Sequence, residues 1–221
     1  MTGLLYVVAT PIGNLEDISA RAIKVLSQVN RIAAEDTRHS SRLLQHLGIN
    51  TPLVAVHDHN EAGRVQSLID QLLAGDSIAL ISDAGTPLIS DPGYRLVAAA
   101  HQANIQVVPV VGACAAIAAL SAAGLPSDRF SFEGFLAAKT SQRQTQLKAL
   151  ANESRTLIFY EAPHRILECV QDMVAIFGAD RRVVLARELT KTFETIKQST
   201  LAELCVFVES DTNQQRGEIV L

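Results

Sequence analysis

A loop rich in carboxylates, hydroxyls, glycine and proline follows the apolar run at residues 77–82. It reads Ser82-Asp83-Ala84-Gly85-Thr86-Pro87, and Asp91-Pro92-Gly93 comes shortly after it. Loops of this length are uncommon in compact domains and often carry function. Asp91 is expected to cap the helix that follows, with Pro92 in the first turn. Asp83 has no such structural duty, so its carboxylate is the candidate to hold a ribose diol or an amino group.

Two further loops combine small residues with turn-forming ones. Thr10-Pro11-Ile12-Gly13-Asn14 comes after the first apolar run, and Val111-Gly112-Ala113-Cys114-Ala115-Ala116 joins the fifth run to an alanine-rich helix. Glycine allows a ligand close to the backbone, and the free N–H groups at a helix start can face a ligand. A plain turn and close helix packing explain these two loops equally well. The sequence has neither a G-x-G-x-x-G nor a Walker A motif, so the signatures of dinucleotide and ATP binding are absent.

Ionisable side chains cluster after the second and third apolar runs. One cluster is Glu35-Asp36-Thr37-Arg38-His39, and the other is His57-Asp58-His59-Asn60-Glu61. Such groups beyond strand ends suit acid–base chemistry or recognition of a polar substrate. A solvated rim with Thr37 as a helix N-cap is the alternative. His57 and His59 would share one face of an extended chain, but no third ligand stands out, so no metal site is expected.

Two charged segments occupy similar positions in the second half of the chain. Tyr160-Glu161-Ala162-Pro163-His164-Arg165 follows one apolar run, and Arg187-Glu188-Leu189-Thr190-Lys191 follows another. Both segments place charge at a strand end. Pro163 at a helix start is the purely structural explanation for the first.

Five short apolar runs position the loops of the first half. They are Leu4–Ala9, Arg31–Ala34, Pro52–Val56, Ser77–Ser82 and Ile105–Val111. Runs that do not alternate with polar residues are typical of strands buried on both faces of a parallel sheet. Helical periodicity fills the gaps, and Gly48 and Gly75 are natural residues to end two of the helices. The pattern predicts an α/β fold with right-handed crossovers.

The second half begins with a small-residue helix at 114–123 and a linker at 124–128. Strands are expected at 130–136, 156–160, 182–187 and 217–221, and helices at 141–150, 166–177 and 201–208. We therefore predict two α/β domains, residues 1–112 with a parallel-rich sheet and residues 113–221 with a mixed sheet. Because the chain stops inside an apolar run, the second domain is expected to be truncated at its end.

The composition narrows the class of protein. The chain has 221 residues, of which 48% are hydrophobic and 19% charged, an ordinary globular balance. Its formal net charge of −4 lacks the basic character of a nucleic-acid-binding domain, so RNA binding would need a local patch. Three distant cysteines argue against a disulfide framework, and no apolar stretch is long enough for a membrane span. A cytoplasmic protein without membrane contact is expected.

Taken together, these motifs and the segment Leu125–Phe130 resemble the tetrapyrrole-methylase-like superfamily over nearly the whole chain. The segments 82–87 and 187–191 are similar to the branch that 2′-O-methylates the ribose of a decoding-region cytidine in 16S ribosomal RNA. The resemblance implies two domains of the tetrapyrrole methylase type, with S-adenosylmethionine in the cleft between them, and a homodimer. It implies 16S rRNA or the small ribosomal subunit as the partner, and no DNA.

The resemblance also implies roles for individual residues. It assigns the cofactor to Pro11, Ser82, Asp83, Ala84, Thr86, Cys114, Ala115, Tyr160 and Arg187. A ribose hydroxyl is a weak nucleophile, so a base near its oxygen should help as the proton leaves. The candidates for this catalytic role are Glu35, Asp36, His57 and Lys191. The candidates for contacts with RNA phosphates are Arg38, Arg42, Arg64 and Arg165.

Two other functions stay open. The chain could methylate a tetrapyrrole or another small molecule with the same cofactor cleft, although the stretches at 35–38 and 187–191 argue against this. It could also be a nucleotide-binding or assembly module without turnover. Such a module would bind the cofactor and transfer no methyl group to any RNA.

Overall fold

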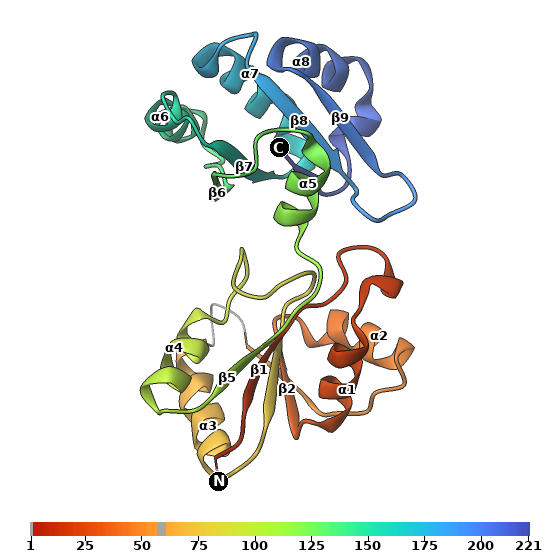
Figure 1. Ribbon diagram of the computed structural model, residues 1–221, viewed down its shortest axis with the longest axis vertical. Coiled ribbons are helices and arrows are strands. Elements are labelled where there is room, and N and C mark those ends of the chain that lie inside the picture. Colours follow the sequence, from red (N-terminus) through yellow and green to blue (C-terminus); the bar gives the residue numbers. More distant parts are fainter. Residues whose placement is uncertain (1, 57–60) are drawn as a thin grey trace. The chain divides into compact units, whose positions relative to one another are not determined.

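The computed structural model describes residues 2–56 and 61–221 of the chain (Figure 1). The chain divides into two compact units, Met1–Cys114 and Ala115–Leu221. Each unit is an α/β structure built around its own five-stranded sheet. The predicted α/β fold class is therefore confirmed. Among the described residues, no helix has the length and apolar character that crossing a membrane requires.

The sheet of the first unit is entirely parallel. Its strands are β1 (Leu5–Val8), β2 (Arg31–Ala34), β3 (Leu53–Ala55), β4 (Ile78–Ile81) and β5 (Val107–Val110). They are arranged in the order β3-β2-β4-β1-β5. All four residues of β4 are buried, as expected for a central strand covered on both faces. The apolar runs thus mark the strands that the sequence predicts.

Four helices cover the two faces of this sheet in pairs: α1 (Ala20–Gln28), α2 (Thr37–His46), α3 (Glu61–Leu73) and α4 (Tyr94–Gln102). One core contains Leu26 of α1 and Leu44 of α2, and a separate core contains Leu68 of α3 and Leu96 of α4. Figure 1 shows α1 and α2 on one side of the sheet and α3 and α4 on the other.

The helix starts correct two expectations. The N-cap of α2 is Asp36, whose carboxylate accepts from the backbone N–H of Arg38, so Thr37 is the first helical residue rather than the cap. The N-cap of α4 is Gly93, with a φ of 122° and no side-chain capping bond. Asp91 is therefore not a cap, because the Pro92-Gly93 turn moves the helix start two residues further along the chain.

The sheet of the second unit is mixed. Its strands are β6 (Phe130–Phe135), β7 (Thr156–Glu161), β8 (Arg182–Arg187), β9 (Thr195–Thr200) and β10 (Ile219–Val220). They lie in the order β6-β7-β10-β8-β9, with β6 and β7 parallel and the remaining pairs antiparallel. Strand β9 was not predicted, because this edge strand, Thr-Ile-Lys-Gln-Ser-Thr, is polar and has no fully buried residue.

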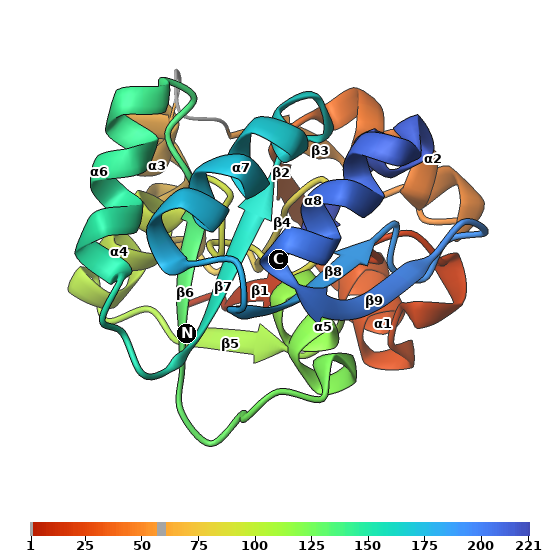
Figure 2. The same cartoon turned by 90° about the horizontal axis from the view of Figure 1, so that it is seen from above.

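The helices of the second unit are α5 (Ala115–Ala123), α6 (Thr140–Leu150), α7 (Ile166–Phe177) and α8 (Leu201–Ser210). Short 3₁₀ helices lie at Leu15–Asp17 in the first unit and at Pro163–Arg165 and Thr212–Gln215 in the second. Helices α6, α7 and α8 lie side by side over the sheet (Figure 2). Phe159 and Leu185 belong to the core beneath them. The next residue, Tyr160, bonds to α5, so strand alternation assigns α5 to the opposite face.

Candidate functional site

The strand order of the first unit creates a topological switch point between β1 and β4. The chain leaves β1 toward the β3 edge of the sheet and leaves β4 toward the β5 edge. In open parallel sheets, ligands bind outside the carboxyl ends of strands where neighbouring connections diverge in this way. The loops at Thr10–Asn14 and Ser82–Gly93 occupy this position.

These two loops are bonded to each other. The N–H of Thr10 donates to the carbonyl of Gly85 at 2.9 Å, and the N–H of Gly85 donates to the carbonyl of Thr10 at 3.1 Å. Thr10 is 1% exposed, and its hydroxyl donates to the carbonyl of Ser82. Gly85 has a φ of +82°, and a Cβ there would lie 3.2 Å from a methyl group of Ile12. The positive φ and the close contact favour glycine at this junction, and the buried Thr10, which was not among the predicted site residues, joins the two loops.

The third predicted loop joins the same cluster. The hydroxyl of Thr86 donates to the carbonyl of Ala113 at 2.9 Å. A Cβ on Gly112 would lie only 2.9 Å from that of Ala9, so the turn after β5 packs closely on the end of β1. The first unit thus brings together the segments that contain Pro11, residues 82–86 and Ala113. Cys114 follows directly and is half-buried.

Asp83 connects this cluster to the end of β2. One oxygen of its carboxylate, Oδ1, accepts from the backbone N–H of Asp36 at 3.1 Å. Within the described part of the chain, Oδ2 accepts no hydrogen bond, and the side chain is half-buried. Burial raises the pKa of the neighbouring Asp91, which also interacts with Ser82 and with the Asp83 charge. Asp83 therefore has an oxygen available for a ligand.

The ionisable cluster at residues 35–39 is only partly suited to the predicted catalytic role of proton abstraction. The hydrogen bond from the Arg38 side chain lowers the pKa of Asp36 to about 2, with help from the Arg38 backbone N–H. A carboxylate with so low a pKa is a weak base at neutral pH. Glu35 is half-buried beside it. His57 lies outside the described residues.

Tyr160 and Arg187 each form hydrogen bonds within the second unit. The phenol oxygen of Tyr160 accepts from the N–H of Ala116 at 3.1 Å, next to Ala115. The buried guanidinium of Arg187 donates to the side chain of Gln214 at 3.1 Å and to the carbonyl of Phe193 at 2.9 Å. The structure therefore gives Tyr160 and Arg187 clear internal bonding roles.

Lys191 is held between two carboxylates. Its Nζ donates to Oε1 of Glu188 at 2.8 Å and to Oε2 of Glu218 at 3.0 Å. Burial opposes the charged form, but these hydrogen bonds outweigh burial and raise the pKa of Lys191. A lysine with a raised pKa stays protonated at neutral pH and is not a base. Glu188 and Thr190 both have positive φ, so the loop that carries Lys191 is strained.

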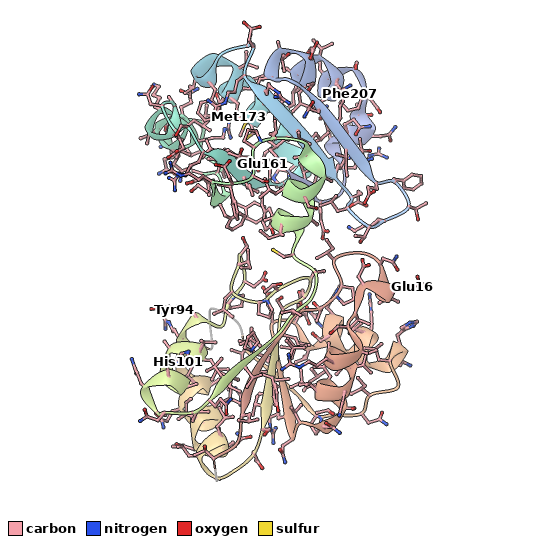
Figure 3. The ribbon with its side chains drawn as sticks, in the orientation of Figure 1. Glu16, Tyr94, His101, Glu161, Met173 and Phe207 are labelled. Atoms are coloured by element: carbon pink, nitrogen blue, oxygen red, sulfur yellow. The ribbon has the colours of Figure 1, made fainter. Side chains whose placement is uncertain are left out.

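Three of the four predicted phosphate contacts lie in the first unit, and these three do not share one face of its sheet. Arg38 and Arg42 lie on α2, whereas Arg64 lies on α3, on the other face of the sheet. Arg165 belongs to the second unit, where it bonds to the buried Glu161 at 2.5 Å. Figure 3 labels Glu161 within that unit. Within the first unit, Arg38 and Arg42 therefore share a face of the sheet, and Arg64 lies on the other face.

A cavity of about 410 Å³ lies in the second unit. Its walls come mainly from α5, β7 and β8 and are largely apolar, for example Leu157, Phe159 and Leu201. Among the residues that the structure describes, none of the predicted site residues lines it. The cavity therefore belongs to the second unit and does not include the predicted site residues Tyr160, Arg165, Arg187 and Lys191 of that unit.

Comparisons with known proteins agree with this architecture. The chain is 64% identical over 219 residues to the ribosomal RNA small subunit methyltransferase I of Pseudomonas aeruginosa, covering 99% of this chain and 78% of that protein. It is 59% identical over 219 residues to the protein of the same name from Escherichia coli O157:H7, covering 99% and 77%.

Two solved structures share the fold. Uroporphyrin-III-C-methyltransferase from Thermus thermophilus matches with a TM-score of 0.66 at 20% identity, covering 99% of this chain and 93% of that chain. A diphthine synthase matches with a TM-score of 0.74 at 16% identity, covering 99% and 89%. The family model for Tetrapyrrole (Corrin/Porphyrin) Methylases matches residues 4–205. This chain belongs to the tetrapyrrole methylase family.

Proposed function

We propose that this chain transfers a methyl group from S-adenosylmethionine to the ribose 2′-oxygen of a cytidine in the decoding region of 16S rRNA, at position 1402. The observation that carries the proposal is the 64% identity, over 99% of the chain, to a ribosomal RNA small subunit methyltransferase I. The motifs at 82–87 and 187–191 support the same branch of the family. S-adenosylmethionine is the methyl donor in this family.

The residues at the switch point fit this cofactor. Oδ2 of Asp83 accepts no hydrogen bond from the described residues, and a carboxylate suits the two hydroxyls of a ribose or an ammonium group. Ala84, next to Asp83, is exposed and has only a methyl side chain, which leaves room for a ligand beside the backbone. In the proposed site, Asp83 binds the cofactor through this oxygen, and Pro11 and Ala84 line the cofactor. Ser82 and Thr86 also hold the loops in place, through hydroxyl hydrogen bonds to Ala84 and Ala113. The resemblance adds Cys114, Ala115, Tyr160 and Arg187.

In the proposed reaction, the protein mainly has to align the ribose hydroxyl with the methyl group and to accept the hydroxyl proton. Bound S-adenosylmethionine supplies a methyl group that is already activated by its sulfonium. The protein has to hold the ribose hydroxyl in line with that methyl group and accept the hydroxyl proton. The low pKa of Asp36 and the protonated state of Lys191 favour Glu35 and His57 as the base. Asp36 and Lys191 then act by positioning or by charge.

The remaining parts of the proposal concern the assembly and its location. We infer a homodimer in the cytoplasm, where the small ribosomal subunit is available as substrate. The resemblance carries both inferences. Analytical ultracentrifugation of the purified protein tests the dimer, and a single species with the mass of one chain would contradict it.

The decisive experiment uses labelled S-adenosylmethionine and small ribosomal subunits from a strain that lacks the methyltransferase. We expect one label per subunit, mapped to a cytidine 2′-oxygen in the decoding region. Label on a base, on another nucleotide or on a tetrapyrrole instead would overturn the proposed substrate. Cofactor binding without transfer to any RNA would instead support the assembly module.

A further inference from the structure

The strand order of the first sheet forces α1 and α2 onto the same face. The connections β1 to β2 and β2 to β3 both run toward the β3 edge, whereas β3 to β4 and β4 to β5 both run back. Right-handed crossovers in one direction put their helices on one face, and the reverse direction uses the other face. Two helices separated by a strand in the sequence therefore form one surface.

This surface is basic although the chain as a whole is acidic. Neither α1 nor α2 contains an acidic residue, while the formal net charge of the chain is −4. Four fixed cations on these helices are exposed: Arg21, Lys24, Arg38 and Arg42. Among the described residues, Arg21, Lys24 and Arg42 have no ion-pair partner. These four residues define the α1–α2 face.

Two of the cations lie at helix positions where the macrodipole makes a positive charge unfavourable. Arg21 and Arg38 are the second residues of α1 and α2, in the first turn. The macrodipole favours acidic side chains there and disfavours cations, by about 0.3–1 kcal/mol each. The macrodipole therefore does not explain these positions, and within the described part of the chain only Arg38 of the two has a local partner, the N-cap Asp36. A ligand that carries negative charge would be attracted both by the cations and by the helix N-termini.

The ion pair between Arg38 and Asp36 does not cancel the positive charge of the α1–α2 face. The pair, at 3.0 Å, is exposed, and exposed pairs are weak. Helix α2 begins three residues after the last residue of β2, and α1 follows β1 through the loop at residues 9–19, so both helices follow carboxyl ends of strands, as the switch-point loops do. The four cations are exposed and lie within the first two turns of α1 and α2. By contrast, α3 on the opposite face carries Asp70 as well as Arg64.

We propose that the α1–α2 face binds the phosphate backbone of the RNA substrate. This inference rests on the proposed function, since that function makes RNA the partner. It goes further by naming the surface, adding Arg21 and Lys24 to Arg38 and Arg42. Exposed cations on two helices that themselves contain no acidic residue suit the regular negative charge of an RNA strand.

The test replaces three cations and measures binding across a salt series. The variant is the triple Arg21→Gln, Lys24→Gln and Arg42→Gln, which leaves the Arg38–Asp36 pair intact. Its affinity for small ribosomal subunits is compared with that of the wild type. Each lost phosphate contact lowers the slope of log K against log salt by about 0.7–0.9, so we expect a loss of about 2–3 in slope. Binding at low salt should weaken by roughly tenfold or more.

The matched control removes three exposed cations elsewhere, as Arg95→Gln, Arg129→Gln and Lys148→Gln. Both triples take the formal net charge from −4 to −7, so a general charge effect would be equal in the two. We expect the control to keep the wild-type slope. Calorimetry with S-adenosylmethionine should give unchanged affinity for both triples, which verifies that they are folded.

Two outcomes would contradict RNA binding by the α1–α2 face. In one, the α1–α2 triple variant keeps the wild-type slope of log K against log salt; in the other, the control triple loses as much slope as the α1–α2 triple. Failure of the proposed function looks different. If the wild type binds subunits with a steep salt slope that the α1–α2 triple reduces, yet transfers no methyl group, the surface is supported and the proposed reaction is contradicted.

Discussion

Replacing Asp83 should weaken cofactor binding more than replacing Asp91. Oδ1 of Asp83 already accepts from the N–H of Asp36 at 3.1 Å, which holds the carboxylate in place and leaves Oδ2 for the ligand. A hydrogen bond to a charged group contributes about 1.5–3 kcal/mol, so Asp83→Ala should raise the Kd for S-adenosylmethionine by roughly 10- to 150-fold. Asp91→Asn keeps an oxygen that Ser82 can donate to, and its effect on affinity should be smaller.

A second variant distinguishes the structural role of Oδ1 of Asp83 from the ligand-binding role proposed for Oδ2. Asp83→Asn keeps an oxygen for the N–H of Asp36 but removes the negative charge, so its stability should stay near that of the wild type while its affinity falls. The assay is calorimetry with S-adenosylmethionine, run beside thermal unfolding without ligand. If Asp83→Asn and Asp83→Ala bind like the wild type while Asp91→Asn does not, the assignment of the ligand oxygen to Asp83 is wrong.

Three further changes test the geometry. Gly85→Ala should lower the free energy of unfolding by about 1–2 kcal/mol, because alanine is strained at a φ of +82° and its Cβ would lie 3.2 Å from a methyl group of Ile12. A urea titration that shows no loss of stability would contradict this. Asp172→Ala should lower the free energy of unfolding by about 3–5 kcal/mol, because it leaves the buried Arg143 without the partner that it binds at 2.6 Å. Replacing both partners, as Arg143→Met with Asp172→Leu, should cost less than Asp172→Ala alone. The pKa of Asp91 is raised by burial, so its ionisation destabilises the fold as pH rises through that pKa. The stability of Asp91→Asn relative to the wild type should therefore increase between pH 3 and pH 7, and a constant difference in melting temperature would refute the raised pKa.

The first half of the fold could be predicted from the sequence because its signals are local. A buried parallel strand needs a continuous apolar run, and all five runs mark strands. Gly48 has a φ of +69° after α2, as its place at the end of the helical pattern predicts. Motifs that are continuous along the chain, such as 82–87, carry the family resemblance for the same reason.

Other features depended on which strands lie side by side. β9 was missed because the polar side chains of an edge strand do not signal burial. Asp91 looked like a cap because Pro92 follows it, but the positive φ of Gly93 moves the helix start. Lys191 looked like a candidate base, and its raised pKa arises partly from Glu218, 27 residues further along the chain.

The sequence by itself determined the fold class, most of the strands and the loops that meet at the switch point. Only the tertiary structure decided how those loops bond to each other and which charges share a surface. The bridge between Thr10 and Gly85 joins residues 75 positions apart in sequence. The α1–α2 face exists because the strand order sends two successive crossovers in the same direction. Such contacts follow from strand order, and the local pattern of residue types does not encode strand order.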